Sequence, residues 1–222
     1  MFQYLLFDLD GTLTDPKIGI TKSVQYALAA QGIEEPDLDK LEPFIGPPLK
    51  ESFEEFYHMD EAHALQAVEK YRERFTVTGI FENELIPGVP ELLAREKERG
   101  AKIAIASSKP TELVLRILEH FDIAVYFDVV VGSEMDGRRS KKEEVVEEAL
   151  RQLLPSEELS DKKNKIAMIG DRKFDIEGAI AHGLTGIGVT FGYAAEGELE
   201  KAGADYIVNT IEELEEVLQK GV

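Results

Sequence analysis

Short apolar runs alternate with amphipathic segments over most of the chain. The apolar runs predict strands at 4–7, 102–106, 127–131, 165–169, 185–190 and 205–208. Helical spacing of the apolar positions predicts helices at 89–99, 111–120, 141–153, 174–182 and 211–219. Strands that are apolar on both faces and separated by helices are typical of a parallel sheet in a doubly wound α/β fold.

Residues 15–86 break this alternation. The pattern there indicates helices only, at 19–31, 48–57 and 60–77, punctuated by prolines and Gly46. We therefore predict a Rossmann-like core made of residues 1–14 and 87–222. A small all-helical cap, residues 15–86, is inserted after the first strand, with joints at Asp15-Pro16 and Ile86-Pro87-Gly88.

Composition and charge narrow the range of partners. The chain of 222 residues is 43% hydrophobic and 31% charged, which favours a globular protein. Its net charge of −19 argues against binding to nucleic acid or to anionic lipid, because both need clustered Lys and Arg. The absence of cysteine excludes disulfides and thiolate chemistry. No positive segment precedes the first apolar run, so we predict a cytoplasmic protein.

Polar residues follow three of the predicted strands directly. They are Asp8 and Asp10, then Ser107, Ser108 and Lys109, and finally Asp171 and Asp175. Ligands of open parallel sheets bind outside the carboxyl ends of the strands, so these side chains are expected to converge. Each aspartate alone could equally serve as a turn or helix-capping residue. Several converging carboxylates repel one another unless a cation joins them, and Mg²⁺ is the simplest such cation.

The first two aspartates suit phosphoryl chemistry. Asp8 and Asp10 are two residues apart and lie on the same side of an extended chain, so both can serve one centre. A carboxylate can attack phosphorus and form an aspartyl-phosphate that water then hydrolyses. A second carboxylate would protonate the leaving alkoxide and later activate the water.

These residues together resemble a known family. The segment Asp8-Leu9-Asp10-Gly11-Thr12-Leu13 is similar to the first motif, DxDGT/V, of the haloacid dehalogenase-like superfamily of phosphatases and phosphotransferases. Ser107 resembles its second motif, Lys142 its third, and Gly170-Asp171 with Asp175 its fourth, GDxxxD. The motifs occur in the family's order, and a helical cap between the first two is also the family's arrangement.

The resemblance implies a role for each acidic residue. Asp8 would be the nucleophile and a magnesium ligand, and Asp10 the general acid and base, with its backbone carbonyl on the metal. Asp171 would bind the metal directly, and Asp175 more distantly, through water. Arg172 stands where the family often has Thr.

The resemblance also implies the residues that hold phosphate. Ser107, the Ser108 amide and Lys142 would bind the transferring group, and the family register favours Lys142 over its neighbour Lys141. Lys109 reaches either the substrate or a neighbouring carboxylate. Gly11 either shapes a turn beside the metal and phosphate or only ends the strand.

The cap is the expected source of specificity. By resemblance it forms a lid that excludes water from the site. In the segment 44–52, the Gly46-Pro47-Pro48 turn either presents Lys50 and backbone amides to the substrate or is a plain interhelical turn.

The resemblance thus implies a magnesium-dependent phosphatase, either a monomer or a weak homodimer, acting on a small phosphomonoester similar to phosphoglycolate or a nucleotide monophosphate. Two alternatives stay open. One is a sugar phosphomutase of the same family. The other is a phospho-accepting signalling or binding module without turnover, although receiver domains of that kind are about half this length and lack the helical insert.

Overall fold

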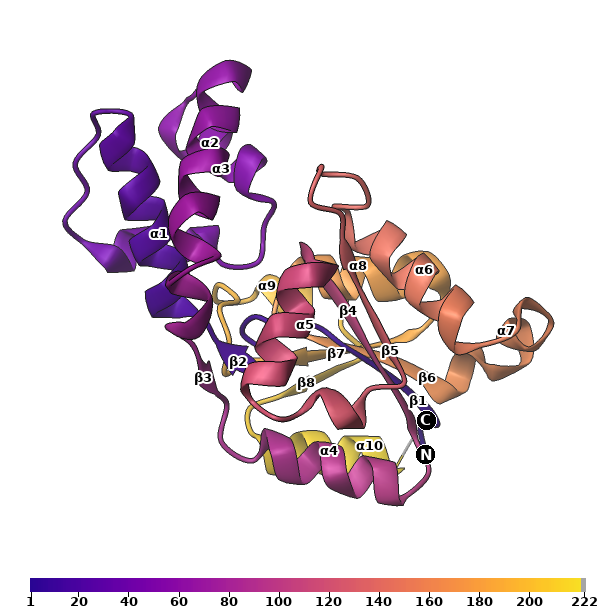
Figure 1. Ribbon diagram of the computed structural model, residues 1–222. Coiled ribbons are helices and arrows are strands. Elements are labelled where there is room, and N and C mark those ends of the chain that lie inside the picture. Colours follow the sequence, from indigo (N-terminus) through magenta and orange to yellow (C-terminus); the bar gives the residue numbers. More distant parts are fainter. Residues whose placement is uncertain (221–222) are drawn as a thin grey trace. The chain divides into compact units, whose positions relative to one another are not determined.

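The computed structural model describes residues 1–220, so the last two residues of the predicted core, 221–222, lie outside the described part (Figure 1). The described chain forms two compact units. One contains Met1–Thr14 and the chain from Leu85 onward, and the other contains Asp15–Glu84. The sequence pattern put the second joint slightly later, at Ile86–Gly88. Each unit is described by itself.

The first unit contains a six-stranded parallel sheet in the order β5-β4-β1-β6-β7-β8. The strands are β1 (Tyr4–Phe7), β4 (Lys102–Pro110), β5 (Val129–Ser133), β6 (Ile166–Gly170), β7 (Thr185–Val189) and β8 (Tyr206–Val208). The chain adds β4 and β5 on one side of β1 and β6 to β8 on the other. The order therefore reverses beside β1, as in a doubly wound fold, and the predicted fold class is confirmed.

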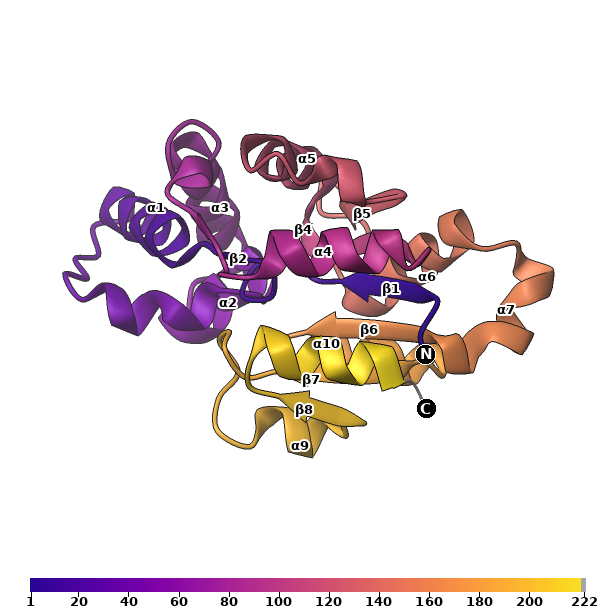
Figure 2. The ribbon, with the colours of Figure 1, turned by 90° about the horizontal axis from the view of Figure 1, so that it is seen from below.

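Helices cover both faces of this sheet. They are α4 (Val89–Glu98), α5 (Thr111–His120), α6 (Lys142–Leu153), α7 (Ser156–Lys162), α8 (Lys173–His182), α9 (Glu198–Ala202) and α10 (Ile211–Lys220). Figures 1 and 2 show α4 and α10 side by side on one face, while α6 and α8 pack on the other. Short 3-10 turns are present at η3 (Ala124–Tyr126) and η4 (Lys163–Lys165).

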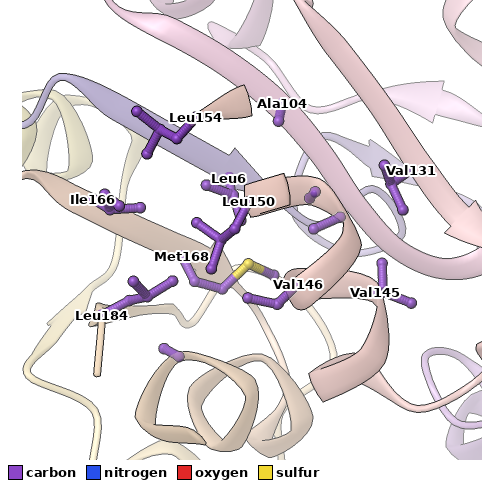
Figure 3. Close-up of a cluster of buried hydrophobic side chains, with 13 residues drawn as sticks. Leu6, Ala104, Val131, Val145, Val146, Leu150, Leu154, Ile166, Met168 and Leu184 are labelled. Carbon is purple, nitrogen blue, oxygen red and sulfur yellow. The ribbon is translucent and has the colours of Figure 1, made fainter. Parts of the chain in front are cut away.

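A buried apolar cluster fills the space between the sheet and α6 and α8 (Figure 3). Leu6 and Met168 come from the central strands β1 and β6, and Val146 and Leu150 come from α6; all four are buried. Strand residues with neighbours on both faces must be apolar on both faces. This requirement explains the uninterrupted apolar runs in the sequence.

The second unit is all helical apart from its boundary. It contains α1 (Lys17–Ala30), η1 (Leu38–Phe44), α2 (Leu49–Tyr57), α3 (Glu61–Phe75) and η2 (Gly79–Phe81). The start of α1 approaches η2 so closely that a Cβ on Gly19 would lie 2.0 Å from the carbonyl oxygen of Gly79. The rings of Phe44 and Phe53, 4.9 Å apart between centroids, join η1 to α2.

Two strands were not predicted. The short strands β2 (Thr14–Asp15) and β3 (Glu84–Leu85) pair with each other where the chain passes between the units. The expectation of no strand between 15 and 86 was therefore wrong at its edges, because two-residue strands carry no periodicity that a sequence pattern could show. Strand β4 also extends to Pro110, with a register shift against β5 between Ala106 and Pro110. Within the described residues, no helix combines the length and the apolar character needed to cross a membrane.

Candidate active site

The register of the central strands brings the predicted site residues to one edge of the sheet. Phe7, near the end of β1, is in register with Ile105 of β4 and with Ile169 of β6. The residues that follow these positions therefore emerge together. The Asp8 amide continues the ladder by donating to the Ile169 carbonyl at 2.9 Å. As predicted, the chain segments carrying Asp8, Ser107 and Asp171 meet at the carboxyl edge.

Lys142 enters this site from the buried face of α6. Its helical neighbours on that face, Val145, Val146 and Ala149, pack in the core. Its Nζ lies 2.7 Å from Asp8 Oδ1 and 2.7 Å from Asp175 Oδ1, and it donates to the Ala106 carbonyl at 3.0 Å. Burial alone would lower the pKa of Lys142, but the ion pairs with Asp175 and Asp8 outweigh it and raise that pKa.

Three carboxylates gather around this lysine. Asp8, Asp171 and Asp175 each offer one oxygen, and these oxygens lie within 4.8 Å of one another. With all three carboxylates ionised, as metal ligands are, their charge exceeds that of Lys142 by two, which a divalent cation would balance. Burial, and then the charges of Asp175 and Asp8, raise the pKa of Asp171 well above its ordinary value. The oxygen donors and the uncompensated charge fit Mg²⁺.

The Asp171 carboxylate occupies a position shaped by two glycines. A Cβ on Gly11 would lie 2.2 Å from Asp171 Oδ2, and a Cβ on Gly192 would lie 2.4 Å from the same oxygen. Gly11 also adopts a φ of +81°, a region that favours glycine. Gly11 therefore shapes the turn beside the acidic cluster, the first of the two interpretations that its sequence allowed.

Asp10 is oriented differently from the three clustered carboxylates. Its Oδ2 lies 2.5 Å from Lys109 Nζ, and both side chains are buried. Burial raises the pKa of Asp10 even though Lys109 lowers it, so this carboxyl holds a proton more readily than an exposed aspartate. Of the two partners predicted for Lys109, the structure places its ammonium on the neighbouring carboxylate. Metal binding by the Asp10 carbonyl stays a prediction.

The end of β5 supports the loop that follows the regular part of β4. Ser133 Oγ donates to the Ser108 carbonyl at 2.8 Å, and the buried Ser107 Oγ accepts from the Lys109 amide at 3.3 Å. Gly132 permits this approach, because a Cβ there would lie 2.2 Å from the Lys109 carbonyl oxygen. The predicted phosphate-binding residues thus lie in the irregular last part of β4, which β5 holds in place.

Asp175 is held at the start of α8. Its Oδ2 accepts a hydrogen bond from the Arg172 amide at 3.0 Å, as an acidic residue in the first turn of a helix commonly does. A Cβ on Gly170 would lie 2.1 Å from the Asp175 carboxyl carbon, so the glycine before Asp171 makes room for this side chain. The Asp175 carboxylate therefore caps the start of α8 and pairs with Lys142 at the same time.

Two more basic residues considered from the sequence, Lys141 and Lys50, have other surroundings within their own units. Lys141, the N-cap of α6, is exposed and lines a surface hollow with Arg138 and Glu144. Lys50 belongs to the helical unit, where its ammonium lies 3.0 Å from Glu61 and 3.3 Å from Glu54. Binding of phosphate by Lys50 stays a prediction.

Several residues that contact the cluster were not predicted from the sequence. The Tyr193 amide donates to Asp171 Oδ2 at 2.7 Å, and Thr12 Oγ1 donates to Asp171 Oδ1 at 3.4 Å. Gly192 and Ser133 also shape the site. Gly192 and Tyr193 follow β7, as other site residues follow their strands. The rule that ligands bind at the carboxyl ends of parallel strands would therefore have found them.

A doubly wound sheet whose carboxyl edge combines buried aspartates, a buried lysine and a serine loop is typical of enzymes of phosphoryl transfer. Residues 5–189 match the family model described as haloacid dehalogenase-like hydrolase. The chain belongs to this family of hydrolases, and within it to the phosphatases.

Relatives of named activity extend over nearly the whole chain. A 5'-nucleotidase of Pseudomonas aeruginosa is 47% identical over 97% of this chain and 95% of its own length. The tyrosine-protein kinase PtkA of Mycobacterium tuberculosis is 36% identical over 97% of this chain and 72% of its own. The crystal structure of a predicted phosphatase from Clostridium acetobutylicum covers 99% of both chains with a TM-score of 0.92 and 46% identity.

Proposed function

We propose that the protein is a magnesium-dependent phosphatase that hydrolyses a small phosphomonoester through an aspartyl-phosphate on Asp8. The observation that carries the proposal is the placement of Asp8. Its carboxylate contacts Lys142 and lies within 4.8 Å of the carboxylates of Asp171 and Asp175. In the family, Asp8 occupies the position of the nucleophile.

Residues of this chain account for each step. The Asp8 carboxylate attacks phosphorus, and the bond to the leaving alkoxide breaks as the Asp10 carboxyl supplies a proton to that oxygen. Asp10 then accepts a proton from water, whose oxygen attacks the phosphorus of the aspartyl-phosphate and restores Asp8. The raised pKa of Asp10 supports its role as the acid of the first step.

Donors of this chain and a metal ion together would stabilise the charge on the transferring phosphoryl group. Lys142, Ser107 and the Ser108 amide act as fixed donors for the phosphoryl oxygens. Asp8, Asp171 and Asp175, the last through water, would hold Mg²⁺, which supplies Lewis-acid polarisation of the phosphate.

One relative, the 5'-nucleotidase, favours a nucleotide monophosphate as substrate. The similarity to a 5'-nucleotidase covers nearly the full length of both chains and so includes the helical unit that we propose as a lid. The alternatives are a phosphoglycolate-like substrate and a sugar phosphomutase activity. A cytoplasmic location and a monomer or weak homodimer stay predictions from the sequence.

The test is phosphate release from a panel of nucleotide monophosphates, phosphoglycolate and sugar phosphates. We expect Asp8→Asn to abolish release while the exposed Asp122→Asn leaves it unchanged, and we expect excess chelator to stop the wild-type reaction. Full activity of Asp8→Asn, or turnover unaffected by chelator, would overturn the proposal. Isomerised sugar phosphate without free phosphate would indicate the mutase, and a long-lived phosphoprotein the signalling module.

A further inference from the structure

The carboxylate of Glu198 joins two segments next to the acidic cluster. Its Oε1 accepts hydrogen bonds from Arg172 Nε at 2.9 Å and from the Lys173 amide at 2.8 Å. Its Oε2 accepts from the Ala195 amide at 3.1 Å. One side chain, only 11% exposed, therefore ties the start of α8 to the loop that precedes α9.

This network keeps the Glu198 carboxylate charged. Burial would raise the pKa of Glu198, but hydrogen bonds from the Lys173 amide, the Arg172 side chain and the Ala195 amide outweigh it and lower that pKa. Hydrogen bonds to an ionised acceptor are stronger than neutral ones, so these contacts hold the two segments firmly together.

Both segments are connected to Asp171, one through the chain and the other through a hydrogen bond. Arg172 follows it directly in the chain, and the loop held by Ala195 carries the Tyr193 amide that donates to Asp171 Oδ2 at 2.7 Å. The Gly192 backbone packs against the same carboxylate. The orientation of the Asp171 side chain therefore depends on a loop whose position Glu198 fixes.

We infer that Glu198, together with Arg172, is a positioning residue that orients Asp171 for metal binding. Asp171 faces the repelling charges of Asp8 and Asp175, so its carboxylate needs fixed donors to hold one orientation. This role also gives a purpose to Arg172, which stands where the family often has Thr. The inference rests on the proposed function, because it takes Asp171 as a metal ligand.

Loss of such an outer partner commonly weakens metal binding by about 10–100-fold. Mn²⁺ serves as the probe, because it prefers the same oxygen ligands as Mg²⁺. Its binding is followed by the electron paramagnetic resonance signal of the free ion. We expect Glu198→Ala to weaken Mn²⁺ binding at least about tenfold. Glu198→Gln keeps a hydrogen-bond acceptor but loses the charge, so its Mn²⁺ affinity should lie between those of the wild type and Glu198→Ala. The matched control is Glu200→Ala, an exposed position on the same helix, and it should bind as the wild type does.

A second readout separates positioning from general stability. Hydrogen exchange of the Tyr193 and Ala195 amides should accelerate in Glu198→Ala and in Glu198→Gln, while the amides of the β1 strand keep their protection. If Mn²⁺ affinity and the exchange of Tyr193 are unchanged in both variants, the inference is wrong. If instead the wild type and Asp171→Asn bind Mn²⁺ equally weakly, the metal site of the proposed function fails, whatever the exchange at Tyr193 shows.

Discussion

Lys142 is the residue on which the buried carboxylates depend most for charge compensation. It contacts Asp8 and Asp175 at 2.7 Å each, and its side chain is only 6% exposed. Removing one partner of a buried ion pair leaves uncompensated charge, which costs far more than the loss of an exposed pair.

Lys142→Met is therefore expected to lower both stability and activity. The free energy of unfolding without metal should fall by about 3–5 kcal/mol, because two buried carboxylates lose their cation. Phosphate release should fall by about a hundredfold or more, because a donor to the transferring group is lost. Urea denaturation and initial rates measure the two effects.

Lys141→Met is the matched control, since Lys141 is adjacent in sequence but exposed. It should change neither quantity appreciably. If Lys141→Met were the more damaging substitution, Lys141 and not Lys142 would be the phosphate-binding lysine.

At the level of secondary-structure elements, Asp128, the residue before β5, links helix α4 to strand β4. Its carboxylate accepts hydrogen bonds from Lys97 Nζ at 2.7 Å, the Ile103 amide at 2.9 Å and Lys102 Nζ at 3.0 Å. Burial raises the pKa of Asp128, but these hydrogen bonds outweigh it and leave that pKa below its ordinary value.

A depressed pKa in the folded state stabilises the protein at pH values above the unfolded pKa of about 3.9. That stabilisation is lost as the pH falls through the lower folded-state pKa. Asp128→Asn should thus cost about 1–2 kcal/mol of unfolding free energy at pH 7, and the difference should shrink towards pH 3. Urea denaturation at both pH values measures this difference in unfolding free energy.

The control is Asp136→Asn, at an exposed ion pair in a loop, which should lower the unfolding free energy little at either pH. An undiminished difference at pH 3 would show that the charge of Asp128 contributes nothing.

Secondary-structure elements differ in how well their sequences predict them. Long elements such as α6 and the central strands could be predicted, because α6 buries one face at helical spacing and β6 is buried at every position. The edge rule for parallel sheets then placed Asp8, Ser107 and Asp171 together. The particular contacts of Tyr193 with Asp171 and of Ser133 with Ser108 could not be predicted, because one partner in each is a backbone group, which every residue type carries.

At the scale of the whole molecule, the net charge of −19 bears on how an anionic substrate arrives. The chain as a whole repels a phosphomonoester, so capture must depend on local groups such as Lys142 and the Ser108 amide. Salt screens long-range forces, with a screening length of about 8 Å at 0.15 M, but affects buried contacts far less.

We therefore expect kcat/KM at saturating Mg²⁺ to stay level or rise as NaCl is increased from low to physiological concentration. Steady-state rates with the best substrate of the panel measure this dependence, with an uncharged osmolyte as the control for bulk effects. A fall of about tenfold or more, typical of electrostatically steered enzymes, would contradict local capture.

The most direct test of the central claim is to trap the intermediate on Asp8. A single turnover is quenched rapidly in acid, and the protein is treated with borohydride, which reduces an acyl-phosphate but not a free carboxylate. We predict homoserine in place of aspartate at position 8 in peptide mass spectra, and no such change in Asp8→Asn. Reduction at another residue, or none at all during confirmed turnover, would contradict the assignment of Asp8 as the nucleophile.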